Sequence, residues 1–224
     1  MGDPDAGAGR ARTAVLISGR GSNLAALIAA CARPDSPAEI ALVVSNRPHA
    51  AGLQHAAAAG IATKVIDHRR FRGREEFDRA VSEALEGSDI RLVCLAGFMR
   101  LLSPWFTERW RDRVLNIHPS LLPAFPGLDT HRRALAAGVR FSGCTVHFVR
   151  AALDAGPIVV QGVVPVRPED TPDALAGRVL QAEHRCYPLA LHLVASGRAR
   201  IEGEQVRIDG TGAPEAIVIN PAPE

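Results

Sequence analysis

Apolar runs alternate with amphipathic segments along the first half of the chain. The apolar runs predict strands over residues 13–18, 39–46, 62–67 and 90–97. Between them, apolar side chains recur at helical spacing and predict helices over residues 23–32, 50–60 and 74–85. The strand segments are apolar almost without interruption, which is typical of strands covered on both faces. The alternation therefore predicts an α/β fold with a doubly wound, mostly parallel sheet and helices on both faces.

The pattern changes after residue 114. One long helix is predicted over residues 171–197, with Thr171 as N-cap, Pro172 at the first helical position and a kink at Pro188. Further strands are predicted over residues 114–119, 141–149 and 156–166, and a hairpin over residues 198–210. Neither an internal repeat nor a linker-like segment interrupts the chain. We expect a single domain over residues 13–209, between a disordered N-terminal tail (1–12) and a loose C-terminal tail (210–224).

Composition narrows the class of protein. Of 224 residues, 47% are hydrophobic and 22% charged, which is ordinary for a soluble globular protein. The net charge of +2 gives no electrostatic reason to expect nucleic acid or an anionic membrane as partner. The four cysteines show no C-x-x-C spacing, and the N-terminus lacks the apolar core of a signal peptide. We expect a cytoplasmic protein that acts on small molecules.

The stretch "SGRGSNL" joins the first predicted strand to the first predicted helix. Gly19 and Gly21 permit a sharp turn and a close approach to a ligand, and Ser22 and Asn23 are expected to cap the helix and offer donors. An anion such as phosphate would fit this helix start. The stretch is neither a Walker loop nor a complete dinucleotide fingerprint, so a tight turn without ligand remains an alternative.

The stretch "NIHPS" ends a predicted strand. Asn116 and His118 are two residues apart, so both side chains point to the same face of that strand. Together they could stabilise an oxyanion, and the alternative is a polar cap for loose backbone groups. Asp154, in "LDAGPI", is a candidate partner for His118, although Asp-x-Gly more often only starts a turn. The histidine spacings indicate no metal site, and no G-x-S-x-G elbow of a serine hydrolase is present.

Several stretches occur together in the order and spacing found in one family. They are "SGRGSNL", "VVSNRPHAAGL", "LAGFMRLLSPWF", "NIHPSLLPAFPGLDTH", "GCTVHFV" and "LDAGPIVVQ". The chain thereby resembles the phosphoribosylglycinamide formyltransferases, from about residue 14 to about residue 203. The resemblance implies a Rossmann-like formyltransferase fold, 10-formyltetrahydrofolate as co-substrate without a metal, and glycinamide ribonucleotide of purine biosynthesis as formyl acceptor. It implies a monomer or a homodimer.

The resemblance also assigns roles to positions of this chain. It implies that Asn116, His118 and Asp154 are catalytic. The implied ribonucleotide contacts are Gly21, Ser22, Asn23 and Glu183. The implied folate contacts are Arg74, Met99, Arg100, Leu101, Leu102, Asn116, Arg150 and Asp154. Two positions depart from the family pattern, because Asp129 stands where some relatives carry histidine and Ala124 where lysine or arginine is common.

In the reaction that the resemblance implies, the substrate amine attacks the formyl carbon directly. Protonated His118 and Asn116 would stabilise the oxyanion, and Asp154 would keep His118 charged and assist proton transfer. Two alternatives are a formyltetrahydrofolate hydrolase and a nucleotide-binding module without catalysis. Related hydrolases carry an additional N-terminal domain, whereas here the catalytic domain is expected to begin after about a dozen residues. A non-catalytic module would be expected to lack part of the trio.

Overall fold

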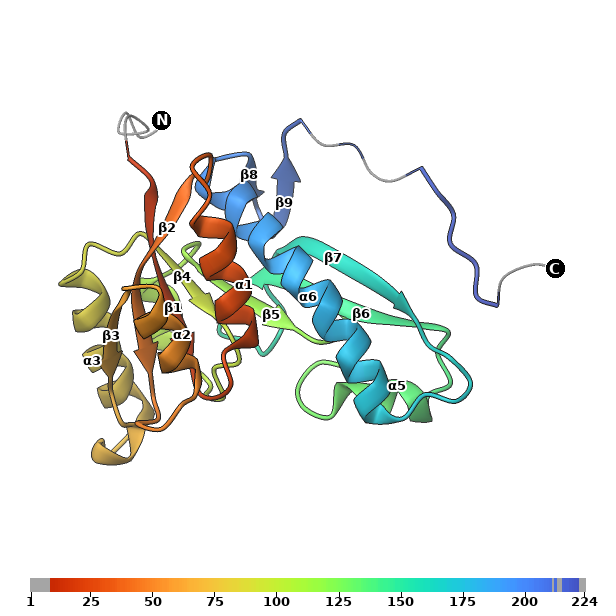
Figure 1. The fold of residues 1–224 in the computed structure, drawn as a ribbon, viewed down its shortest axis with the longest axis horizontal. Helices are drawn as coiled ribbons and strands as arrows, with labels where there is room; N and C mark the ends of the chain where they lie inside the picture. The colour runs from red at the N-terminus through yellow and green to blue at the C-terminus, as the bar shows by residue number, and fades with distance from the viewer. Residues whose placement is uncertain (1–8, 211, 213–214, 222–224) are drawn as a thin grey trace.

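The computed structural model describes residues 9–210, 212 and 215–221. Their centre is a seven-stranded sheet with the strand order β3-β2-β1-β4-β5-β6-β7 (Figure 1). Strands β1 to β5 are parallel to one another, and β6 and β7 complete the sheet as antiparallel neighbours. The strands are β1 (Ala11–Ile17), β2 (Ala38–Ser45), β3 (Ala62–Val65), β4 (Leu92–Leu95), β5 (Val114–His118), β6 (Phe141–Phe148) and β7 (Ile158–Pro165).

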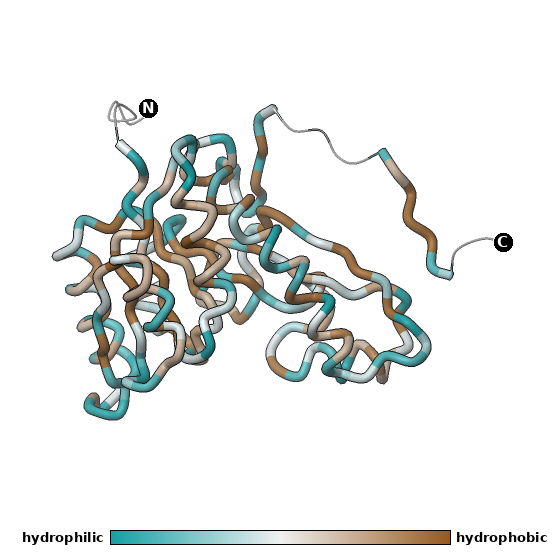
Figure 2. Tube along the Cα trace, in the orientation of Figure 1, coloured by the Kyte–Doolittle hydropathy of each residue, from teal (hydrophilic) through white to brown (hydrophobic). Residues whose placement is uncertain are grey.

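Helices cover both faces of this sheet. Alternate side chains of β1 are buried on opposite faces of the sheet, because Val15 and Ile17 belong to one hydrophobic cluster and Ala14 and Leu16 belong to another. The first cluster packs under α1 (Ser22–Cys31), α2 (Gly52–Ala58), α5 (Thr130–Ala136) and α6 (Pro172–Ala195). The second packs under α3 (Arg74–Glu86) and α4 (Pro104–Arg109). Figure 2 shows hydrophobic positions along the strands of the sheet. The predicted doubly wound, mostly parallel sheet is confirmed.

The long C-terminal helix follows its sequence signals. The Thr171 side chain accepts a hydrogen bond from the Ala174 amide at 3.2 Å, and Pro172 opens the helix, so the predicted N-cap is confirmed. Strands β8 (Ala199–Glu202) and β9 (Gln205–Ile208) form the predicted hairpin. The described residues beyond this hairpin form neither helix nor strand.

Some boundaries and short elements differ from expectation. Residues 11 and 12, predicted as tail, are the first residues of β1, because their backbone pairs with β2. The rest of that tail lies outside the described residues, except residues 9 and 10. The helices α4 and α5, of six and seven residues, and a 3-10 helix (His68–Arg70) were not predicted, since such short elements show little helical periodicity.

Candidate active site

Most of the predicted site residues lie at one edge of the sheet. Strands β1 to β5 are parallel, so the loops that follow them all leave from the edge formed by their carboxyl ends. The strand order reverses between β1 and β4, because β2 and β3 lie on one side of β1 and β5 lies beyond β4. Ligands of open α/β sheets bind in the crevice at such a reversal.

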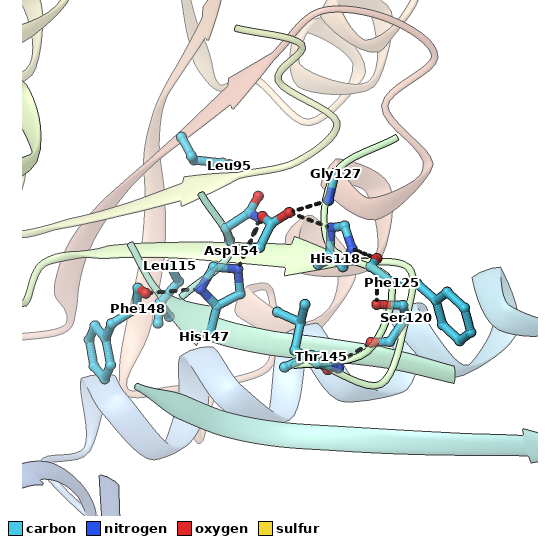
Figure 3. A network of polar contacts seen from close by, with 12 residues as sticks. Leu95, Leu115, His118, Ser120, Phe125, Gly127, Thr145, His147, Phe148 and Asp154 are labelled. Carbon is cyan, nitrogen blue, oxygen red and sulfur yellow. Dashed lines mark hydrogen bonds and ion pairs between the residues drawn. The ribbon is translucent and has the colours of Figure 1, made fainter. Parts of the chain in front are cut away.

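His118 and Asp154 meet at the end of β5. The His118 Nδ1 lies 3.4 Å from the Asp154 Oδ2, and their side chains are only 7% and 8% exposed (Figure 3). The same carboxylate oxygen accepts a hydrogen bond from the Gly127 amide at 2.8 Å. The other ring nitrogen, Nε2, lies 2.9 Å from the Phe125 carbonyl oxygen and must carry a proton, since a carbonyl only accepts. The predicted pairing of His118 with Asp154 is therefore present, with Nδ1 facing the carboxylate.

The position of Asp154 in the turn "LDAGP" depends on Gly156. A Cβ at Gly156 would lie 1.7 Å from the carbonyl oxygen of Phe148, at the end of β6. The chain can pass that carbonyl only without a side chain, and the Phe148 amide then donates to the Pro157 carbonyl at 2.9 Å. Asp154 itself has a φ of 51°, in the left-handed region that aspartate tolerates better than most residues. Backbone geometry thus directs this carboxylate toward His118.

Asn116 is held by a histidine that the sequence analysis did not select. In the antiparallel register, Asn116 of β5 lies opposite His147 of β6. The Asn116 Nδ2 lies 3.2 Å from the His147 Nε2, and the His147 Nδ1 lies 2.9 Å from the Phe148 carbonyl oxygen. That carbonyl requires a proton on Nδ1, so in the neutral ring Nε2 is the acceptor for the amide. Burial lowers the pKa of His147, which favours this neutral form.

Polar contacts also fix the loop between β5 and α5. The Thr145 hydroxyl donates to the Ser120 carbonyl at 2.7 Å and accepts from the Leu122 amide at 3.0 Å. The Gln161 side chain donates to the Leu122 carbonyl at 2.9 Å, and the Ser120 hydroxyl donates to the Ala124 carbonyl at 2.6 Å. The loop that carries Phe125 and Gly127 to His118 and Asp154 is therefore tied to β6 and β7.

Two of the predicted ribonucleotide residues touch each other. The Asn23 Nδ2 donates to the Glu183 Oε2 at 2.7 Å, which joins the start of α1 to the middle of α6. Both residues are buried, and burial raises the pKa of Glu183 against the opposing effect of this hydrogen bond. The expected capping by Ser22 and Asn23 is wrong. Gly21 occupies the N-cap with a φ of 77° and no side-chain cap, because Asn23 turns toward Glu183 instead.

A basic groove opens beside the "SGRGSNL" loop. Its volume is about 630 Å³, and the loops that follow β1, β2 and β3 line it. Its basic side chains were not predicted, because they come from three separate segments. They are the arginines Arg20, Arg47 and Arg69 and the histidines His49 and His68. Gly21 packs against Gly52 at the start of α2, where a Cβ at Gly21 would lie 2.6 Å from the Gly52 Cα. Close glycine packing thus brings the two loops together at the groove.

The predicted folate residues do not form one group. Asn116 and Asp154 belong to the cluster around His118, and the others lie in three further places. Met99 and Leu101 are exposed, Arg100 and Leu102 are half-buried, and all four lie in the loop between β4 and α4. The Met99 amide donates to the Ser18 hydroxyl at 2.8 Å, which ties this loop to the "SGRGSNL" loop. Arg150 behaves differently from the rest, because its guanidinium pairs with Asp112 at 2.8 Å and Glu204 at 3.0 Å. Arg74 is exposed at the first position of α3.

Two further properties concern metals and membranes. Among the described residues, no group of three His, Cys, Asp or Glu side chains is placed to hold a metal ion. Within the same part of the chain, every helix is too short or too polar to traverse a bilayer.

The chain is similar to known proteins in sequence and fold. Residues 11–191 match the formyl transferase family. The chain is 53% identical over 199 residues to the trifunctional purine biosynthetic protein adenosine-3 of Gallus gallus, which covers 89% of this chain but 20% of that protein, so it spans about a fifth of this relative's length. It is 44% identical over 200 residues to the phosphoribosylglycinamide formyltransferase of Escherichia coli K12, covering 89% of this chain and 94% of that one. The solved structure of glycinamide ribonucleotide transformylase 1 from Symbiobacterium toebii superposes with a TM-score of 0.87 at 48% identity, over 89% and 94% of the two chains.

Proposed function

The chain belongs to the formyl transferase family, and from this premise we propose that it transfers the formyl group of 10-formyltetrahydrofolate to the amine of glycinamide ribonucleotide, a step of purine biosynthesis. The observation that carries the proposal is the cluster of Asn116, buried His118 and Asp154 at the sheet edge where ligands of this fold bind. The enzyme acts as a cytoplasmic monomer or homodimer on small molecules.

The cluster supplies two donors for a developing negative charge. When the amine attacks the formyl carbon, the carbonyl oxygen becomes an oxyanion. One N–H of the Asn116 amide donates to His147, which leaves its second N–H for this oxygen. The His118 Nε2 is already engaged with Phe125, so Nδ1 is the nitrogen that donates to the oxyanion. Both donors are held before the substrate arrives, and little reorganisation is needed in the transition state.

Asp154 serves the proton balance of the reaction. Its carboxylate lies 3.4 Å from the His118 Nδ1, close enough to exchange a proton with that ring. As the tetrahedral intermediate collapses, the bond between the formyl carbon and the folate N10 breaks and the new amide bond remains. The proton lost by the attacking amine must reach N10, and the Asp154–His118 pair is the adjacent acceptor and donor for this transfer, directly or through water.

The two substrates approach the cluster from different loops. The ribonucleotide phosphate lies at the start of α1, against Gly21 to Asn23, with the cations of the basic groove beside it. Glu183, buried beside Asn23, holds the glycinamide end. The folate lies against Met99 to Leu102, where exposed apolar side chains suit an aromatic pterin ring, and the loop 150–154 covers that ring.

The proposal is tested by following 10-formyltetrahydrofolate turnover with and without glycinamide ribonucleotide. We expect tetrahydrofolate to appear only when the ribonucleotide is present, together with one formylated ribonucleotide per folate. Release of formate without the ribonucleotide would instead indicate a hydrolase. Absence of turnover in both mixtures, with retained ribonucleotide binding, would indicate a binding module.

A further inference from the structure

A buried carboxylate that the reaction scheme does not use lies behind the folate loop. Asp78 is on α3, is 1% exposed, and accepts a hydrogen bond at its Oδ2 from the Ser103 amide at 2.6 Å. Its second oxygen, Oδ1, is buried without a hydrogen-bond partner. Burial raises the pKa of Asp78, against the opposing hydrogen bond from Ser103 and the charges of Arg100 and Arg74. Burying a carboxylate oxygen without a hydrogen-bond partner costs desolvation free energy, which packing alone does not explain.

The loop between β4 and α4 depends on contacts of this kind. Residues 96–103 form neither helix nor strand, so a ladder of backbone hydrogen bonds does not fix them. At one end the Met99 amide donates to the Ser18 hydroxyl at 2.8 Å. At the other end Asp78 holds Ser103, whose hydroxyl in turn caps α4 by accepting from the Phe106 amide. Met99 to Leu102 therefore lie between two side-chain anchors, one on each side.

Phe77, the neighbour of Asp78, adds a second link between α3 and the loop. The Arg100 guanidinium lies over the ring of Phe77, the neighbour of Asp78 on α3, at 5.2 Å from the ring centroid. The Nε of Arg100 is buried and lacks a hydrogen-bond partner, as does the Asp78 Oδ1. Phe77 also stacks on Phe98, in the first part of the loop, with ring centroids 6.4 Å apart. The start of α3 thus contacts both ends of the loop and its arginine.

We propose that Asp78 is a positioning residue for the folate co-substrate. Its carboxylate fixes the Ser103 end of the loop, and thereby presents Met99 to Leu102 in the conformation that receives the pterin. This inference rests on the proposed function, because the loop is a folate site only if the chain uses folate. Asp78 is remote from the reacting atoms in this scheme, so its loss affects binding of the folate more than the chemical step.

The test compares Asp78→Ala and Asp78→Asn with the wild type in steady-state kinetics. We expect Asp78→Ala to raise the KM for 10-formyltetrahydrofolate about tenfold or more, as loss of a hydrogen bond to a charged group implies. The kcat and the KM for the ribonucleotide should change less than about twofold. Asp78→Asn retains an oxygen for the Ser103 amide and should recover a large part of the KM, but not all, because a neutral acceptor forms a weaker hydrogen bond than a carboxylate.

Ser82→Ala is the matched control. Ser82 lies one turn further along α3, is 2% exposed, and accepts a hydrogen bond from the Trp110 indole at 2.9 Å, away from the loop. Its loss should lower the melting temperature without changing the KM for folate. Equal KM values for Asp78→Ala and wild type, or a KM rise shared by Ser82→Ala, would overturn the inference. An inactive wild type that also fails to bind tetrahydrofolate would instead refute the proposed function.

Discussion

The catalytic cluster and the basic groove lie at the same sheet edge but are built in opposite ways. In the cluster, His118 and His147 are buried, and each ring has a nitrogen anchored to a backbone carbonyl. In the groove, Arg20 and Arg47 are exposed and line an open volume. Buried, anchored donors keep one geometry at the cost of desolvation, whereas exposed cations remain adaptable and are screened by salt. Substitution in the cluster should therefore impair the chemical step, and substitution in the groove should weaken binding gradually.

His118→Ala should give the largest effect in the cluster. It removes one of two oxyanion donors, and loss of one such donor typically lowers kcat by about 10²–10³. The fold should remain, because the cluster is at a strand end and not in either hydrophobic layer. The measurement is kcat together with the far-ultraviolet circular dichroism and melting curve. His192→Ala, in the last turn of α6, serves as the control and should keep near-normal turnover. Near-normal turnover in His118→Ala would refute the assigned role.

Gly156→Ala tests whether the backbone positions Asp154. The added Cβ would lie 1.7 Å from the Phe148 carbonyl oxygen, so strand β6 or the turn must shift. We expect a loss of about 3 kcal/mol in the free energy of unfolding, at the upper end for overpacking, with a reduced kcat in the protein that still folds. Chemical denaturation gives the first quantity. Gly177→Ala in α6 is the control, because a Cβ there meets no atom within 4 Å, and it should raise stability.

The sequence predicted those parts of the site that a single strand or turn determines. Alternation along β5 placed Asn116 and His118 on one face. The stretch "LDAGPI" offered Asp154 as a candidate partner, and the family resemblance assigned it a catalytic role. His147 was missed because its contact with Asn116 depends on the antiparallel register of β5 with β6, which local periodicity does not specify. Arg20, Arg47 and Arg69 were missed for a similar reason, since packing of three loops brings them to one groove. Asp78 was missed because in the sequence it is one of several polar residues of an amphipathic helix, and its contact with Ser103 exists only in the folded chain.

His147→Phe tests how the cluster orients Asn116. The substitution keeps a ring but removes the acceptor for the amide, so we expect kcat to fall about tenfold, as loss of one hydrogen bond implies, with both KM values little changed.

The buried His147 of the wild type also implies that stability depends on pH. Burial lowers the pKa of His147 in the folded chain, so the unfolded chain takes up the proton first and stability falls as the pH drops below about 6.5. This part of the acid destabilisation should be absent from His147→Phe in melting curves recorded from pH 7.5 to 5. An equal fall in melting temperature between pH 7.5 and 5 for the two proteins would contradict a buried, neutral His147.

Arg47→Ala should give the smallest effect, because it removes one exposed cation among several in the groove. We expect the KM for glycinamide ribonucleotide to rise about threefold with an unchanged kcat, and the rise to shrink at high ionic strength, where an exposed charge is screened. Arg33→Ala carries the same charge change in the surface pair with Asp35, where the arginine side chain is 70% exposed, and should leave the KM unaltered. Steady-state kinetics at 0.05 M and 0.5 M salt would separate the two variants. A kcat loss in Arg47→Ala as large as that in His147→Phe would remove the contrast between groove and cluster, since a binding cation would then act on the chemical step.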